Sequence, residues 1–278
     1  MHVRSALAAI AALTTSMAFP PSFAEGQSSP PAEMVEIPVT PLPFVLQGFL
    51  RHPESAGRSP AVVLLPACAE DTKRLDEDWG ARISSWGYTT LTIDGLNTRG
   101  IKNCGIIANT DPSDLAADAY RALDFLVQQH FVDPKRTAVV GFALGARQTL
   151  LAIERGAVQS ASKHKFQAAA AFYPRCVVFK GNMTVPTLIL IGEHDDVGTA
   201  DACRKMVAGE DDVGISRQKD EGATVRLIVY PDAHFGFDNP TLKKPITFLG
   251  HHLEYNEPAA QQSGHALREF LNSVLSNQ

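Results

Sequence analysis

Short apolar runs rich in β-branched residues alternate with stretches of helical periodicity along most of this chain, and this alternation restricts the fold more than any other feature. Residues 61–65 form a continuous apolar run that ends at Pro66, which is typical of a strand buried on both faces of a sheet. Residues 113–130 place apolar side chains on one helical face, with Asp114 in the first turn. The alternation predicts an α/β fold with a mostly parallel sheet covered by helices on both faces. The predicted strands are residues 61–65, 88–94, 137–141, 166–173, 186–192 and 224–230, and the predicted helices are residues 72–86, 113–130, 144–155, 199–207 and 259–275.

The domain organisation follows from composition and from the N-terminal pattern. Residues 36–40 and 44–50 precede the first predicted helix and are expected to form antiparallel strands at one edge of the sheet. A composition of 45% hydrophobic and 20% charged residues over 278 positions is that of a globular chain and excludes the disordered and coiled-coil classes. No repeat or low-complexity tract divides residues 36–278, which are predicted to form a single domain. With a net charge of −5 and no basic cluster, no nucleic-acid partner is expected.

Residues 1–24 have the pattern of a secretory signal peptide. Arg4 supplies a positive start, residues 6–19 are largely apolar, and small residues precede a cleavage site after Ala24. The alternative, a membrane-anchoring helix, would need ~20 apolar residues. We therefore expect removal of residues 1–24, a flexible leader over residues 25–35, and no transmembrane segment in the mature chain. The protein is expected to be secreted, in a bacterium to the periplasm.

Export would place the four cysteines in an oxidising compartment, where they become candidates for disulfides. Cys68 and Cys104 lie in neighbouring segments, as do Cys176 and Cys203, so the favoured pairs are 68–104 and 176–203. Four cysteines allow three connectivities, and buried free thiols are the alternative to any pairing.

A sharp strand-to-helix turn is predicted at residues 141–145, which read Gly-Phe-Ala-Leu-Gly between a strand and a helix. The spacing and context are those of the G-x-S-x-G nucleophile elbow of α/β-hydrolases, where glycines let two backbones approach closely. The nucleophile position holds Ala143, which offers neither a lone pair nor a proton. The sequence thus predicts an elbow with an inert central residue.

An acid and a base follow in the chain order of that fold. Asp195 comes after the strand predicted at residues 186–192, and His234 comes after the strand predicted at residues 224–230. A lone loop histidine is more often solvated or capping, but the agreement of three elements in order and position favours a catalytic arrangement. Since the carboxyl ends of parallel strands share one edge, these side chains are expected near Ala143. Asp196 is the less favoured acid.

At these residues the chain resembles the dienelactone hydrolase family over nearly all of the mature sequence. The resemblance implies a single-domain α/β-hydrolase with a Cys or Ser nucleophile, an Asp and a His. Two departures stand out, because Ala143 replaces the nucleophile and Pro66-Ala67-Cys68-Ala69-Glu70 stands where relatives often have His-Gly-x-Gly-Gly. The resemblance rests on VVLLPACAE (62–70), WGYTTLTIDGLNTRG (86–100), FVDPKRTAVVGFALGA (131–146), AAFYPRC (170–176), LILIGEHDD (188–196) and VYPDAHFGFD (229–238).

Backbone and arginine groups complete the predicted site. An oxyanion hole in this fold is built from backbone N–H groups, which are those of Leu144 and of Ala67 or Cys68 in this chain. Members of the family hold a substrate carboxylate with an arginine near the site. The resemblance implies that role for Arg99 or Arg175, with an ordinary surface arginine as the alternative for each.

Three functions are compatible with these residues. By resemblance, the chain is a carboxylic ester or lactone hydrolase that has diverged or lost activity at Ala143, since removing the nucleophile of a serine hydrolase lowers turnover by on the order of 10⁶. The second function is a non-enzymatic protein that keeps a pocket for a small ester, lactone or carboxylate. The third is general-base chemistry by His234 and Asp195 without a covalent intermediate.

No metal ion or cofactor is predicted. A metal site would draw on His251, His252 or His265, but we find no carboxylate or cysteine at a recognised ligand spacing from them. The expected partner is a small molecule, and the oligomeric state stays open.

Overall fold

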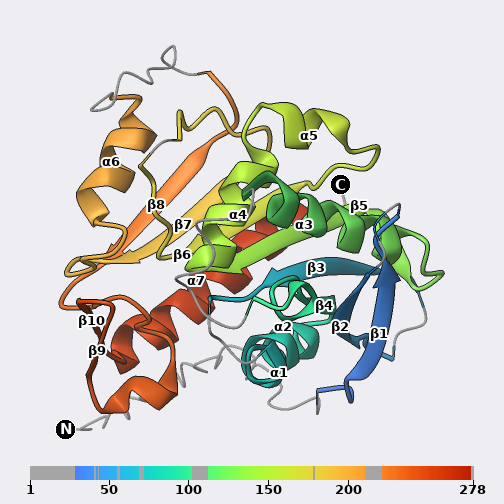
Figure 1. Cartoon of the computed structure of the whole chain (residues 1–278), viewed down its shortest axis with the longest axis horizontal. Helices are drawn as coiled ribbons and strands as arrows, with labels where there is room; N and C mark the ends of the chain where they lie inside the picture. Colours follow the sequence, from blue (N-terminus) through green and yellow to red (C-terminus); the bar gives the residue numbers. More distant parts are fainter. Residues whose placement is uncertain are drawn as a thin grey trace, which may run out of the picture.

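The computed structural model of the chain contains one large β-sheet, covered by helices, and a separate small hairpin (Figure 1). The predicted signal peptide and Cys104 lie outside the residues that the structure describes. Those residues are 29–40, 42, 44–54, 57–68, 72–101, 112–177, 179–210 and 221–276.

The large sheet confirms the predicted fold class. Its strands are β1 (Glu33–Pro38), β2 (Val45–Arg51), β3 (Ser59–Leu65), β4 (Thr89–Asp94), β5 (Val132–Phe142), β6 (Ala168–Phe172), β7 (Thr187–Gly192) and β8 (Val225–Tyr230). They lie in the order β1-β2-β4-β3-β5-β6-β7-β8. The pairs β1–β2 and β2–β4 are antiparallel, and the remaining pairs are parallel. The predicted flexible leader extended too far, because Glu33 already pairs with Leu50 and residues 33–35 belong to β1.

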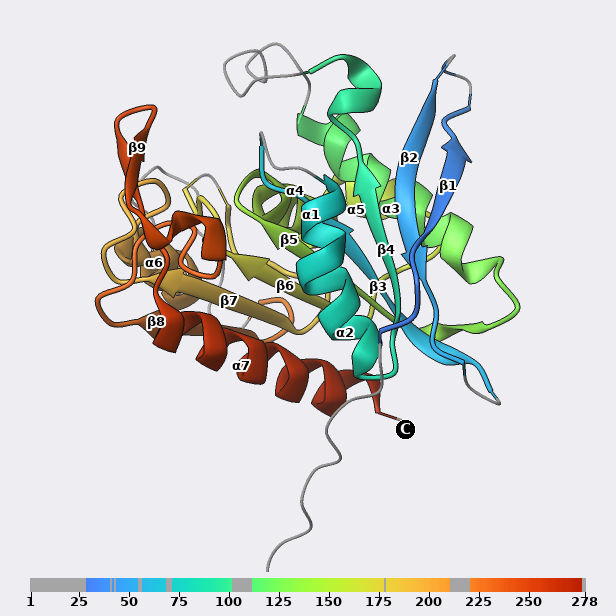
Figure 2. The same ribbon diagram turned by 90° about the horizontal axis from the view of Figure 1, so that it is seen from below.

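Helices cover both faces of the sheet, with α3, α4 and α5 on one face and α1, α2 and α7 on the other (Figures 1 and 2). Their bounds are α1 (Thr72–Leu75), α2 (Ala81–Ser85), α3 (Pro112–Val127), α4 (Leu144–Ile153), α5 (Ala157–Ala161), α6 (Ala200–Ala208) and α7 (Glu257–Leu275). The helix predicted at residues 72–86 is divided, since a π-helical turn, Asp76–Gly80, joins α1 to α2. The carboxylate of Asp76 is buried there and pairs with Arg51 at 2.6 Å. No helix in the described ranges is long and apolar enough to cross a bilayer.

An aromatic cluster in the core connects the end of β5 with the segment that follows β8. The rings of Phe142 and Phe172, which end β5 and β6, stack at 4.6 Å. Tyr173 lies beside them and packs on Phe235 at 4.8 Å and on Phe237 at 5.6 Å. Because these rings are mostly buried, their packing fixes the position of the segment after β8 relative to the turn after β5.

A small antiparallel hairpin, formed by β9 (Ile246–Phe248) and β10 (His251–Leu253), projects from the sheet and was not predicted (Figure 2). A β-bridge joins Leu253 to Phe235, and His251 Nδ1 lies 3.3 Å from Asp196 Oδ1. These contacts attach the hairpin to the segments that follow β7 and β8. The hairpin therefore stands at the carboxyl edge of the sheet, where the candidate residues lie.

Candidate active site

The turn between β5 and α4 has the backbone of a nucleophile elbow. Ala143 adopts φ 51° and ψ −107°, a conformation that L-residues rarely take. Its N–H donates to the carbonyl of Phe172 at 3.1 Å. A Cβ added at Gly141 would stand 2.1 Å from the carbonyl oxygen of Gly145, and one at Gly145 would stand 2.1 Å from that of Leu65. The two glycines are therefore required by close backbone contacts, and the side chain at the apex is a methyl group.

The loop after β3 lies against the beginning of α4, where the oxyanion hole was predicted. Gly145 N–H donates to the carbonyl of Pro66 at 3.1 Å. Leu144 is the first residue of α4, so its N–H has no acceptor within the helix. Ala67 and Cys68 follow Pro66 directly and are partly buried. The backbone arrangement thus brings the predicted oxyanion-hole segments together, with Cys68 held in a disulfide.

Asp195 is buried in the loop after β7 and accepts two backbone hydrogen bonds. Its Oδ1 accepts from the N–H groups of Val197 at 2.9 Å and Gly198 at 2.8 Å, whereas its Oδ2 is buried without a partner. Burial raises the pKa of Asp195 to about 6, against the lowering effect of the two backbone donors. The side chain is therefore easily protonated for an aspartate.

His234 lies in the segment after β8, beside two other histidines. Its ring centroid is 4.2 Å from that of His252 and 5.4 Å from that of His194. Burial lowers the pKa of His234, the charge of His252 lowers it further, and Glu254 opposes both effects. The imidazole is therefore neutral near pH 7, with one nitrogen available to accept a proton.

The loops that carry Asp195 and His234 are in close backbone contact. A Cβ at Gly192 would stand 2.2 Å from the carbonyl oxygen of Ala233, and that oxygen accepts from His194 N–H at 2.9 Å. Neither a hydrogen bond nor an ion pair joins the Asp195 and His234 side chains within the described residues. Asp195 Oδ2 and His234 Nδ1 are both buried without a hydrogen-bond partner. The acid and the base are thus neighbours by loop position, and each retains one unsatisfied atom.

The two candidate substrate arginines differ in how their charge is used. The guanidinium of Arg99 makes two contacts with Asp118, at 2.5 and 3.0 Å, and stacks over the ring of Phe44. Its side chain is 12% exposed, so Arg99 acts as an internal ion-pair partner in this structure. Arg175 is exposed beside the disulfide Cys176–Cys203, and the structure records no ion pair for it within the described ranges. Arg99 is thus already paired with a carboxylate, whereas Arg175 is paired with none among the described residues.

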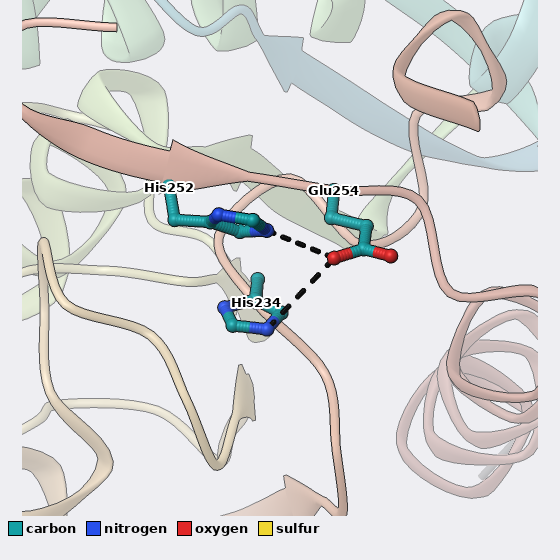
Figure 3. A group of neighbouring side chains, drawn as sticks. All are labelled: His234, His252 and Glu254. Carbon is teal, nitrogen blue, oxygen red and sulfur yellow. Dashed lines mark hydrogen bonds and ion pairs between the residues drawn. The ribbon is translucent and has the colours of Figure 1, made fainter. Parts of the chain in front are cut away.

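Sequence reasoning missed Glu254 and did not place His252 beside His234. Glu254 Oε2 is 2.8 Å from His252 Nε2 and 3.9 Å from His234 Nε2 (Figure 3). The expectation that no carboxylate stands at ligand spacing from these histidines was wrong. Residues at i and i+2 along an extended segment project to one side, which places Glu254 next to His252, and the bridge at Leu253 brings both to His234. The spacing of His252 and Glu254, two residues apart, was the sequence signal that could have identified this pair.

The predicted disulfide between Cys176 and Cys203 is present. It links the segment after β6 to α6, next to the loop that carries Asp195. Cys68 is also disulfide-bonded, whereas its predicted partner, Cys104, lies outside the described residues.

Comparison with models of known families identifies a family for this chain. A sequence model of the dienelactone hydrolase family matches residues 46–275. Lipase 1 from Moraxella sp. is 27% identical over 158 residues, which cover 54% of this chain and 44% of the lipase. The chain therefore spans less than half the length of this curated relative.

Solved structures of the same kind share the fold. A putative dienelactone hydrolase from Klebsiella pneumoniae superposes with a TM-score of 0.66 at 18% identity, covering 86% of this chain and 97% of that one. A dienelactone hydrolase from Anabaena variabilis gives 0.61 at 18% identity, with 89% and 99% covered. A thermophilic esterase from Thermogutta terrifontis gives 0.65 at 14% identity, with 90% and 97% covered. At these identities the likeness establishes the fold.

Proposed function

The chain belongs to the dienelactone hydrolase family, and from this premise we propose that its site binds small carboxylic esters or lactones and hydrolyses them by direct attack of water. The observation that carries the proposal is the intact elbow backbone around Ala143. A methyl group at the apex excludes a covalent acyl intermediate on this residue, while Leu144 N–H, at the first position of α4, still has no acceptor within the helix. The site therefore keeps the groups that stabilise an oxyanion and lacks the nucleophile.

His234 supplies the base in this proposal. His234 Nε2 takes a proton from a water molecule, and the oxygen of that water adds to the carbonyl carbon of the ester. The oxyanion that forms is stabilised by Leu144 N–H, an interaction of a kind that contributes about 10²–10³ in rate. The C–O bond then breaks, and the leaving alcohol takes the proton from His234. General-base catalysis of this kind contributes about 10²–10⁴.

Asp195 is the positioning residue for His234. Its unpaired Oδ2 and the unpaired Nδ1 of His234 are complementary, since a carboxylate accepts from the imidazole N–H that fixes the reactive tautomer. Catalytic hydrogen bonds are often long in unliganded enzymes and shorten when substrate binds. Arg175 is the side chain proposed to hold a carboxylate on the substrate.

A second candidate function is ligand binding without turnover. It is favoured by the absence of a hydrogen bond between Asp195 and His234 in the described structure, because a protein that only binds has no need of an aligned pair. Both candidates involve the same residues and the same class of small ester, lactone or carboxylate.

A hydrolysis assay tests the proposal. The purified chain is assayed in the presence of a chelator against short aryl esters and small lactones, and we expect slow turnover without a burst of product. His234→Ala should abolish turnover and Asp195→Asn should lower it, whereas His265→Ala, an exposed histidine on α7, should leave it unchanged. Turnover that survives both site substitutions would place the chemistry elsewhere. Binding without turnover would establish the second candidate.

A further inference from the structure

Three side chains at the carboxyl edge of the sheet converge on one point. His234 follows β8, while His252 lies on β10 and Glu254 follows that strand (Figure 3). One ligand atom from each, either an imidazole nitrogen or a carboxylate oxygen, lies within 4.8 Å of the others. We infer that His234, His252 and Glu254 form a binding site for one divalent transition-metal ion, with Zn²⁺ as the cation that best fits the donors.

The separations suit a four-coordinate ion. His252 Nε2 and Glu254 Oε2 are 2.8 Å apart, and His234 Nε2 and Glu254 Oε2 are 3.9 Å apart. Zinc ligands at about 2.0–2.1 Å in tetrahedral geometry are separated by roughly 3.3 Å from one another. The two measured separations lie on either side of that value, and no two of the three ligand atoms are more than 4.8 Å apart. Side-chain rotation is the adjustment that we expect on ion binding.

Backbone contacts hold the two segments that carry these donors. Glu254 N–H donates to the carbonyl of Phe235 at 3.4 Å, and a β-bridge pairs Phe235 with Leu253. His252 N–H donates to Asp196 Oδ2 at 3.2 Å. Each of the three metal-ligating side chains therefore lies on or next to a residue whose main chain is held in place. This lowers the conformational entropy that is lost when an ion binds.

The ligand types and the solvent exposure of the three side chains favour an ion of intermediate softness that keeps one coordination position open. Two imidazoles and one carboxylate match catalytic zinc sites, in which three protein ligands leave the fourth position to water or substrate. The side chains of His234, His252 and Glu254 are 26%, 43% and 40% exposed, so solvent reaches the point between them. Mg²⁺ and Ca²⁺ prefer oxygen donors and are not expected to bind.

Binding of the ion at this site does not depend on the proposed function. A catalytic role for the ion does rest on the proposed function, because it assumes that the site hydrolyses esters or lactones. Coordination uses the same His234 Nε2 that acts as the base in the metal-free protein, so the bound ion takes over the activation of water. A bound ion would lower the pKa of coordinated water, whose proton would pass to the solvent. The resulting hydroxide would add to the ester carbonyl carbon, and as the C–O bond broke the leaving alkoxide would take up a proton from the solvent.

Calorimetry on chain without an added histidine tag tests binding directly. After treatment with a chelator and dialysis, we expect one Zn²⁺ per chain with micromolar or tighter affinity, and no binding of Mg²⁺. His252→Ala should weaken Zn²⁺ binding by about 100-fold or more, since it deletes a ligand. His265→Ala and His194→Ala are matched controls. The first changes an exposed histidine on α7. The second changes another cluster of three potential ligands, Glu193, His194 and Asp232, which are all exposed; both variants should retain the affinity.

Two results would overturn the site: wild-type protein that binds no Zn²⁺, or equal affinity in wild type and His252→Ala with circular dichroism confirming that the variant is folded. Glu254→Gln provides a second check, because it preserves side-chain size and should still weaken binding. An ester assay with and without Zn²⁺ separates this inference from the proposed function. Stoichiometric binding without any hydrolysis keeps the metal site and refutes the hydrolase. Hydrolysis by a chain that binds no Zn²⁺ supports the hydrolase and refutes the metal site.

Discussion

Ala143 occupies a strained backbone position although its methyl group has no chemistry to perform. A non-glycine residue with φ 51° and ψ −107° costs about 1–3 kcal/mol and persists where surrounding contacts impose it. Those contacts are hydrogen bonds from Ala143 N–H to Phe172 and from Arg147 N–H to Ala143. The neighbouring structure therefore maintains the elbow independently of the residue at its apex.

That independence predicts that Ala143→Ser restores covalent catalysis. The substitution adds one hydroxyl to a partly buried Cβ at the apex, so folding should be unchanged and ester hydrolysis should rise by about 10³-fold or more. Steady-state kinetics with an aryl ester measure the gain, and a burst of product would report the acyl-enzyme. Ala157→Ser, at an exposed position that begins α5, is the matched control and should gain nothing.

The gain should disappear in Ala143→Ser combined with His234→Ala, because the hydroxyl and its base act as a unit. A folded Ala143→Ser protein that hydrolyses none of the esters or lactones tried would contradict the prediction. The altered loop at residues 66–68 would then be the place where the oxyanion hole fails.

Asp195 should impose a pH dependence on stability. Its pKa is raised from 3.8 to about 6 in the folded chain, so the folded state binds the proton more tightly than the unfolded state does. The stabilisation of the folded state by proton binding at Asp195 is complete below about pH 4 and is lost as the pH rises through about 6. Asp195→Asn removes the buried charge and preserves an oxygen acceptor for Val197 and Gly198. We expect the substitution to stabilise the fold by up to about 3 kcal/mol at pH 8.

Thermal or urea denaturation from pH 4 to 8 measures this effect, and the stabilisation should vanish at the acid end. Asp232→Asn is the matched control, because Asp232 is 89% exposed and its left-handed backbone conformation suits asparagine. An Asp195→Asn protein whose relative stability is the same at both ends of the range would refute the prediction.

At the scale of elements, the turn after β5 depends on glycine for contact with its neighbours. A Cβ at Gly145 would stand 2.1 Å from the Leu65 carbonyl oxygen, which belongs to a buried central strand and cannot move aside cheaply. Gly145→Ala should therefore destabilise the fold by about 3 kcal/mol or more. Gly57→Ala, where nothing lies within 4 Å, should be near neutral. Chemical denaturation of the two variants makes the comparison, and equal stabilities would contradict it.

Elements with strong local patterns were predictable, and those held by distant contacts were not. The buried run of β3 and the glycines at Gly141 and Gly145 carry their signal within a few residues. The hairpin of β9 and β10 has no comparable pattern and is positioned by Asp196 and Phe235. The resemblance implies a substrate contact for Arg99, and its ion pair with Asp118 could not be foreseen because Asp118 lies on a different element. For the same reason Glu254 was overlooked as a neighbour of His234.

At the scale of the whole molecule, disulfides stabilise the end of the sheet that carries the site. Cys176–Cys203 joins the segment after β6 to α6, and Cys68 is bonded in the loop after β3. Disulfides persist in oxidising compartments. Together with the pattern of residues 1–24, they lead us to propose that the chain is exported.

Export predicts a chain that begins at Glu25 and has no free thiols. N-terminal sequencing and thiol titration of denatured, exported protein measure both features, whereas reductant should release all four cysteines. Reduction of Cys176–Cys203, whose cysteines are 27 residues apart, should lower the free energy of unfolding by about 3–4 kcal/mol. The reason is that an unfolded chain without the disulfide has more conformational entropy than one with it. A variant with Cys176→Ala and Cys203→Ala should already lack this contribution, so reductant should shift its melting temperature less. Protein that keeps residues 1–24 and titrates four thiols without reductant would refute export.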